Sequence, residues 1–416
     1  MNAAAVRRVK YACYSTNLMM AIVGNLSPVL FLTFRSLYGL SFSLLGFLVL
    51  INFVTQLLVD LVLSFFSHRF NIPRLIKSIP VIAFFGFCLY ALLPIVFPGA
   101  VFAGLCLGTI VFSAASGLAE VLISPVIAAL PAEDPDREMS KLHSVYAWGA
   151  VSVIIVSTLF LLVAGSTRWP LLAMLFAMVP LASALLFAGS EIPNMETPQR
   201  VSGALAMMKD RGVWLCILAI FLGGASECTM AQWSSSYIER ALGIPKVVGD
   251  LLGVALFSIM LGTGRTLYAK IGKNIGRVLT IGSLGAVACY FTAAVSGIPA
   301  VGLLACAMTG LCTSMLWPGS LVVASDKYPQ GGVFIFAIMA AGGDLGASVV
   351  PQLLGMIADA AMISPKLSAM AAGMNLAPEQ LGMKLGMLFG MLFPLAGTFV
   401  FLYIWKKWRS EKKNAA

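Results

Sequence analysis

Apolar residues dominate the chain in long runs that short polar segments separate. Each run is about 20 residues or longer, which is the length that an α-helix needs to cross the ~30 Å hydrocarbon core of a bilayer. Membrane β-strands would instead alternate over segments of about 10 residues. The pattern therefore predicts an all-α membrane protein with 12 transmembrane helices, over residues 10–34, 41–66, 76–97, 100–129, 138–165, 169–190, 212–238, 246–270, 277–297, 300–325, 331–358 and 380–405.

The most polar long stretch, residues 191–211, lies between the sixth and seventh predicted spans. Short basic connections follow the second and eighth spans, at 67–77 and 270–279, so one feature recurs at equivalent places in two halves. A weak internal repeat of this kind predicts two six-helix bundles related by a pseudo-two-fold axis. We expect an N-terminal bundle (1–190), a cytoplasmic linker (191–211) and a C-terminal bundle (212–416).

Composition and charge support this interpretation. The chain is 60% apolar and 11% charged, against about 45–50% and about 25% in soluble proteins, which excludes a soluble enzyme or a disordered chain. The net charge of +10 does not indicate a nucleic-acid partner, because the 27 basic residues lie in short clusters between the apolar runs. Most of them, Arg265 included, fall on one side if both termini are cytoplasmic. We expect a monomer in the lipid bilayer of the bacterial inner membrane.

Four carboxylates lie inside the predicted spans: Asp60, Glu120, Glu227 and Asp344. Each costs ~2.5–3.5 kcal/mol at the centre of a membrane helix, and such groups commonly mark ion paths. Small and polar residues share helix faces with them, which would also suit helix packing. Asn or Ser would pack helices at lower cost, so we expect the acids to bind a coupling cation, H⁺ or Na⁺. Asp60, near the cytoplasmic end of its span, could instead brace an inner gate.

Other polar and aromatic side chains in the spans could bind a sugar-like solute, because amides bond hydroxyl groups and aromatic rings cover C–H faces. The candidates for substrate binding are Asn25, Gln56, His143, Tyr146, Gln232, Trp233 and Trp317. Trp233 could belong instead to the aromatic belt of the membrane interface, and His143 could be an interface residue.

Helix-breaking residues predict helices interrupted near the middle of the membrane, where free backbone groups favour a binding site. They lie at Pro28, Gly223–Gly224, Trp317–Pro318–Gly319 and Gly342–Gly343. The sequence has no Walker loop, no zinc-type His/Cys cluster and no haem motif. We therefore expect no enzymatic activity, no cofactor and no metal.

The chain resembles the major facilitator superfamily in its six-plus-six spans and its basic loops after spans 2 and 8. It is most similar to the fucose permease type, the fucose–galactose–glucose:proton symporters, through GLAEVLISPVIAALP in span 4 and SKLHSVYAWGA in span 5. Glu120 falls on that group's essential carboxylate. Ser27 stands where the group has a second coupling acid, which Glu227 or Asp344 would have to replace. The resemblance implies cation-coupled symport of a monosaccharide-like solute by alternating access.

Two alternatives belong to other functional classes. A drug or metabolite exporter of the same fold would carry a Gly-Pro-containing fifth span, whereas this span reads WGAVSVIIVSTLFLLV. A receptor or assembly factor that moves no solute would have no need for acids inside the membrane.

Overall fold

The computed structural model describes residues 3–66, 69–131, 135–193, 207–271, 274–328 and 332–415, which are helical apart from short connections. Twelve helices in this part of the chain are long and apolar enough to cross a membrane. The predicted all-α fold with twelve spans is therefore confirmed. At a few helical positions, His143 among them, the side chain lies outside the described part.

The chain forms two compact units. Unit 1 contains Met1–Leu40 and Ile51–Val201, and unit 2 contains Ser41–Leu50 and Ser202–Ala416. The sequence analysis kept all of 1–190 in one bundle, whereas the structure groups the short segment Ser41–Leu50 with the second unit.

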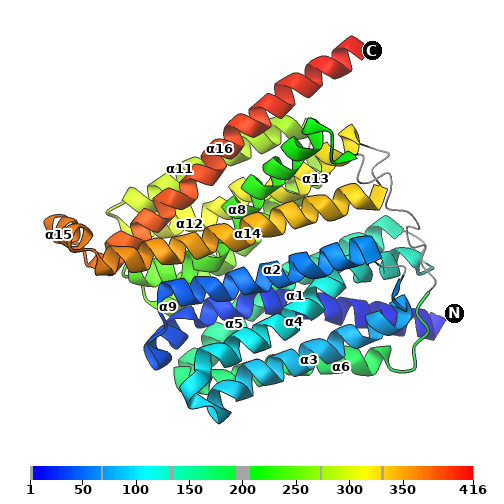
Figure 1. Ribbon diagram of the computed structural model, residues 1–416, viewed down its shortest axis with the longest axis horizontal. Coiled ribbons are helices and arrows are strands. Elements are labelled where there is room, and N and C mark those ends of the chain that lie inside the picture. The colour runs from blue at the N-terminus through cyan, green and yellow to red at the C-terminus, as the bar shows by residue number, and fades with distance from the viewer. Residues whose placement is uncertain are drawn as a thin grey trace. The chain divides into compact units, whose positions relative to one another are not determined.

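Six long helices and two 3₁₀ turns make up the first half of the chain. They are α1 (Ala3–Tyr38), α2 (Phe42–Phe66), α3 (Ile72–Val96), η2 (Pro98–Ala100), α4 (Val101–Ala129), α5 (Pro135–Ala164), η3 (Ser166–Arg168) and α6 (Trp169–Phe187). In unit 1, α3 packs on α4 and α6, and α1 packs on α5 and α6 (Figure 1). A Cβ atom added at Gly108 would lie 2.5 Å from the Cα of Tyr90. Glycine therefore allows α3 and α4 to approach closely, as small residues do in membrane proteins.

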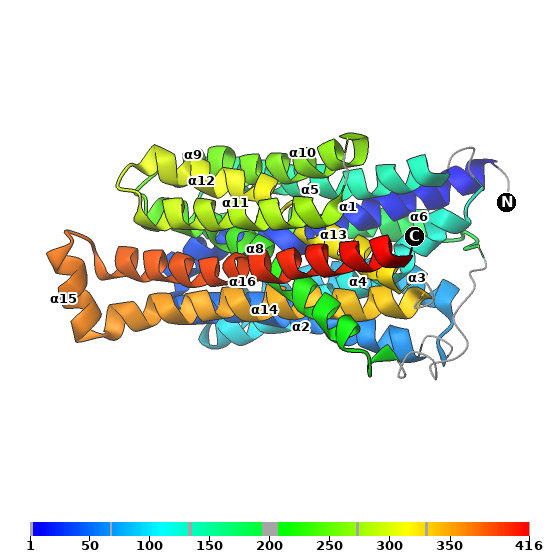
Figure 2. The ribbon, with the colours of Figure 1, turned by 90° about the horizontal axis from the view of Figure 1, so that it is seen from above.

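The second half contains more segments, because two of its spans change helix type or break. The segments are α8 (Arg211–Arg240), α9 (Lys246–Gly249), the π-helix η4 (Asp250–Ala255), α10 (Leu256–Ile271), α11 (Ile275–Val295), α12 (Pro299–Thr313), α13 (Leu316–Lys327), α14 (Gly332–Ile363), α15 (Pro365–Gly373) and α16 (Pro378–Ala415). Helix α8 packs against α12, α13, α14 and α16. Helices α14 and α16 lie side by side, with α15 joining them at one end (Figure 2).

The expected helix breaks are found at one of four places. α12 ends at Thr313 and α13 begins at Leu316, as predicted. Helices α1, α8 and α14 instead run unbroken through Pro28, Gly223–Gly224 and Gly342–Gly343, so the predicted breaks there are wrong. The glycines allow close packing: a Cβ at Gly224 would lie 2.6 Å from the carbonyl oxygen of Gly343.

The start of α2 explains why Ser41–Leu50 belongs to unit 2. The carboxylate of Asp359 in α14 accepts hydrogen bonds from the backbone N–H of Phe42 (3.0 Å) and of Ser43 (2.6 Å). The Ser41 hydroxyl accepts a third, from Leu44 (3.2 Å). The first N–H groups of a helix have no partner within it, so Asp359 caps α2 and holds its first turn on α14.

Candidate functional site

The polar stripes expected along the second and fourth spans meet in unit 1. The side-chain oxygen of Asn52 accepts hydrogen bonds from the Ser113 hydroxyl (2.6 Å) and the Gln56 amide (3.3 Å). A Cβ at Gly117 would lie 3.1 Å from the Cα of Gln56. Helices α2 and α4 therefore touch along their polar faces.

Asp60 and Glu120 lie about one turn further along these two helices. Their nearest carboxylate oxygens are within 4.8 Å of each other. Asp60 is 2% exposed, whereas Glu120 is exposed. Two charges about 4 Å apart repel by ~4 kcal/mol at an effective dielectric constant of 20, and a bound proton or cation removes that repulsion. The pair therefore has the geometry of a cation-binding group, and Asp60 belongs to it rather than standing alone.

The candidate solute-binding residues of the first and fifth spans lie on packed helices. The Asn25 amide donates to the carbonyl of Ala21 in its own helix (2.8 Å). The Tyr146 hydroxyl lies beside Gly24, where an added Cβ would be 3.3 Å from it. Pro28 has no N–H to bond the Gly24 carbonyl four residues earlier, so a hydroxyl beside this backbone suits a continuous α1. His143 precedes Tyr146 in α5 by about one turn.

Trp233 of α8 lies in the core of unit 2. Its side chain is fully buried, and its indole N–H donates to the carbonyl of Pro351 (3.0 Å). Its ring meets that of Phe42 edge-on, with centroids 5.9 Å apart. Full burial excludes a place in a lipid-facing aromatic belt. The hydrogen bond of the indole N–H instead joins α8 to α14. The neighbouring Gln232 is 7% exposed.

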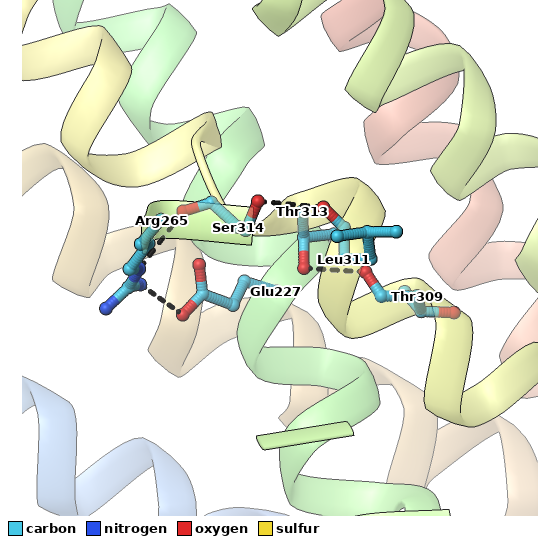
Figure 3. A network of polar contacts seen from close by, with 6 residues as sticks. All are labelled: Glu227, Arg265, Thr309, Leu311, Thr313 and Ser314. Carbon is cyan, nitrogen blue, oxygen red and sulfur yellow. Dashed lines mark hydrogen bonds and ion pairs between the residues drawn. The ribbon is translucent and has the colours of Figure 1, made fainter. Parts of the chain in front are cut away.

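Glu227 and Arg265 form an ion pair between α8 and α10, with 3.0 Å between Oε1 and Nη2 (Figure 3). The Nε of Arg265 donates to the backbone carbonyl of Ser314 (3.1 Å). Pro318 lies four residues after Ser314 and lacks the N–H that a continuous helix would supply to this carbonyl. The predicted helix break thus provides the acceptor that orients the arginine.

Arg265 is the residue that the sequence analysis missed. We grouped it with the basic residues of a cytoplasmic connection, whereas the structure places it inside α10, in a membrane-spanning segment that ends at Tyr268. The available signal was a charge inside the predicted span 246–270. A basic residue near the end of a span is normally expected on the cytoplasmic side of the membrane, and this expectation hides its role as a partner.

Trp317 and Asp344 lie close to the same helix break. The Trp317 ring covers two backbones: added Cβ atoms at Gly224 and Gly343 would lie 2.9 and 2.5 Å from its carbon atoms. Trp317 is partly exposed, and Asp344, which follows Gly343 in α14, is 3% exposed. Gly224 precedes Glu227 by one helical turn. A charge pair, an aromatic ring and a third acid are therefore gathered within unit 2.

A separate ionic network is centred on Glu138, which lies outside the spans at the start of α5. Glu138 accepts hydrogen bonds from Lys141 and from the Tyr14 hydroxyl, both at 2.8 Å, and pairs with Lys10 at 2.9 Å. The bonds from Lys141, Lys10 and Tyr14 lower the pKa of Glu138 to about 2. The network ties α5 to α1.

Comparisons with known proteins agree with this architecture. Residues 12–351 match the Major Facilitator Superfamily, while the comparison with curated protein sequences gives no match. A bacterial homologue of the human lysosomal transporter Spinster, inward-facing and occupied, has a TM-score of 0.75 at 13% identity, covering 97% of each chain. A D-xylose–proton symporter has a TM-score of 0.73 at 16% identity, covering 94% of this chain and 97% of its own.

The E. coli fucose:proton symporter has a TM-score of 0.56 at 15% identity, covering 93% of this chain and 98% of its own. At such identities the similarities show a shared fold and no more. They do not single out the fucose permease type among transporters of this fold.

Proposed function

Because the chain belongs to the Major Facilitator Superfamily, we propose that it is a secondary active transporter that couples H⁺ entry to symport of a monosaccharide-like solute. The proposal places it in the bacterial inner membrane, with both termini cytoplasmic, working as a monomer by alternating access. The observation that carries it is the proximity of Glu120 and Asp60, whose carboxylates lie within 4.8 Å on two membrane-spanning helices.

The two members of the pair have different surroundings. Glu120 is exposed, while Asp60 is buried, so the proposal has Glu120 take up the proton and Asp60 share it. One proton reduces the charge of the pair from −2 to −1, which lowers the cost of moving it through surroundings of lower dielectric constant. H⁺ is the coupling ion in this proposal, because one proton on one carboxylate oxygen is enough to remove a charge from the pair.

The solute-binding residues in this proposal are those that the sequence analysis selected, apart from Trp233, whose ring is fully buried and whose indole N–H is bonded to Pro351. Asn25, Gln56, His143 and Tyr146 lie on helices of the first half, and Gln232 and Trp317 on helices of the second. The part-buried amide of Asn25 and the Tyr146 hydroxyl are suited to bonding sugar hydroxyl groups. Trp317, partly exposed, can place its ring against a C–H face.

The test is transport by the full chain reconstituted in liposomes, with a panel of monosaccharides. An inward H⁺ gradient should drive uphill uptake of at least one member by the wild type. Glu120→Gln should abolish accumulation while leaving solute exchange between the two sides of the membrane. Glu191→Gln, the same change at an exposed site outside the spans, should transport normally.

Three outcomes would contradict the proposal. Uptake that ignores both H⁺ and Na⁺ gradients would remove coupling. Normal accumulation by Glu120→Gln would assign the proton to another group. Active extrusion of the tested solutes would favour the exporter alternative.

A further inference from the structure

An arginine inside a membrane span requires an explanation beyond stability. Arg265 lies near the end of its span, and from there a basic side chain commonly extends to the membrane interface. Its partners, Glu227 and Ser314, lie near the middle of the spans Arg211–Arg240 and Pro299–Ala324, so the guanidinium is held well inside the membrane. An ion pair with one exposed partner commonly adds only about 0–1 kcal/mol to stability. The Glu227–Arg265 pair is therefore poor evidence of a structural role.

The Arg265 guanidinium is held in a fixed orientation, but only two of its three nitrogens have hydrogen-bond partners among the described residues. Nε and Nη2 have partners, whereas Nη1 makes no hydrogen bond or ion pair with the described residues and points away from both Ser314 and Glu227 (Figure 3). The Arg265 side chain is 40% exposed, compared with 13% for Glu227. A guanidinium held on one edge and accessible on another is suited to bind a planar, two-oxygen anion, because its parallel N–H groups match a carboxylate.

Glu227 behaves as an internal substitute for such an anion. Its Oε1 accepts from Arg265, and its Oε2 is buried without a hydrogen-bond partner in the described part of the chain. A carboxylate that binds a guanidinium through one oxygen is held more weakly than a carboxylate that binds it through both. An incoming carboxylate can therefore compete with Glu227 for the arginine.

The proposed function supplies the rest of the anion, because a monosaccharide-like solute that carries a carboxylate is a sugar acid. Trp317 lies three residues after Ser314, whose carbonyl holds Arg265, and its indole is partly exposed. Trp317, which the proposed function assigns to solute binding, would give the same unit an aromatic side chain for the ring of a sugar acid, and Arg265 would be the partner of its carboxylate.

We propose that the solute carries a carboxylate, as a uronate does, and that Arg265 binds this group in competition with Glu227. The inference rests on the proposed function, that of a transporter for a monosaccharide-like solute, and narrows its substrate class. It assigns opposite effects to the two members of the ion pair. Removing Arg265 removes the site, while removing the charge of Glu227 removes the competitor.

The test is equilibrium binding of D-glucuronate, D-galacturonate and uncharged D-glucose to the purified full chain. We expect the wild type to bind a uronate at least tenfold more tightly than glucose. Arg265→Gln should abolish this preference, and Arg265→Lys, which keeps the charge but not the planar fork, should retain part of it. Glu227→Gln should bind the uronate several-fold more tightly. Arg277→Gln, the same change at an exposed position of unit 2, should bind like the wild type.

Opposite responses of the two variants separate a binding role from a structural one, since loss of a purely structural ion pair would weaken both alike. Absence of uronate binding by the wild type, or equal affinity for glucose, overturns the inference even if Arg265→Gln does not fold. Gradient-driven glucose uptake without uronate preference would leave the proposed function standing. A uronate preference without uptake under any gradient would refute the transport proposal and leave the anion site.

Discussion

The crossing of α8 and α14 permits a quantitative test, because both helices are unbroken where the sequence predicts breaks. Gly224 lies at this crossing. A Cβ added there would lie 2.6 Å from the carbonyl oxygen of Gly343 and 2.9 Å from a ring carbon of Trp317. Ordinary contacts of this kind begin at 3.4 Å, so Gly224→Ala must move the helix or the ring.

The magnitude follows from two opposing effects. Overpacking of this kind costs ~1–3 kcal/mol, and alanine recovers up to ~1 kcal/mol over glycine within a helix. We expect a net loss of ~1–2 kcal/mol for Gly224→Ala. Gly262, in α10 of the same unit, has no atom within 4 Å of an added Cβ. Gly262→Ala therefore keeps only the favourable effect and should stabilise by ~0.5–1 kcal/mol.

Thermal unfolding of the purified protein can be followed with a thiol-reactive fluorophore. Cys216 and Cys306 are buried in unit 2 and become reactive when it unfolds. At ~2–4 °C per kcal/mol for a unit of this size, Gly224→Ala should unfold ~2–8 °C below the wild type. Gly262→Ala should unfold ~1–4 °C above it.

A shift of the same sign in both variants would refute the argument, because it would mean that helix propensity alone decides the result. A Gly224→Ala protein as stable as Gly262→Ala would show that α8 and α14 do not approach as closely as described. The glycines would then regain the helix-breaking role that the sequence predicts.

Three further substitutions test contacts at the helix ends. The pKa of Glu138 lies at about 2, below its ordinary value of 4.5, so the ionised carboxylate stabilises the fold fully above pH ~4.5 and loses this effect as the pH falls toward 2. The unfolding temperature of Glu138→Gln should therefore fall less than that of the wild type between pH 4.5 and pH 2. Equal falls in the two proteins would contradict this prediction. Asp359→Ala removes two capping hydrogen bonds at the start of α2, and Ser41→Ala removes one. At ~1 kcal/mol for each cap, the Asp359 variant should unfold at a lower temperature than the Ser41 variant. The reverse order would show that Asp359 does not hold the helix.

The fold was predictable because spans are set by a local property, the length of an apolar run. All twelve were found in this way. The glycines were misinterpreted because the effect of a glycine depends on what lies opposite it, which Gly343 provides for Gly224. The break at Trp317–Pro318–Gly319 was predictable, since a proline removes a helical N–H whatever its surroundings.

The candidate site was predictable residue by residue but not in its pairings. Charges inside spans are visible in a sequence, and Asp60, Glu120 and Glu227 were selected on that ground. Contacts between helices decide which of these acids lies beside another acid and which lies beside a basic residue. Arg265 was overlooked because it lies toward one end of its span, while its guanidinium reaches a partner near the middle of another.

These pairings divide the acids into two kinds. The resemblance to the fucose permease type implies a second coupling acid and leaves Glu227 or Asp344 to supply it, since Ser27 replaces the usual one and shares a hydrogen bond with Tyr90 (2.8 Å). Glu227 is poorly suited to the task, because Arg265 already offsets its charge.

Asp60 has the opposite surroundings, because another carboxylate, that of Glu120, lies within 4.8 Å. Repulsion favours cation binding at this pair, while the neutralised pair at Glu227 favours exchange of one anion for another. We therefore place the proposed proton coupling at Glu120 and Asp60 and the recognition of solute charge at Arg265. Under this division, Glu120→Gln changes solute accumulation without changing the preference for an acidic solute. Arg265→Lys changes that preference without changing the coupling of transport to H⁺.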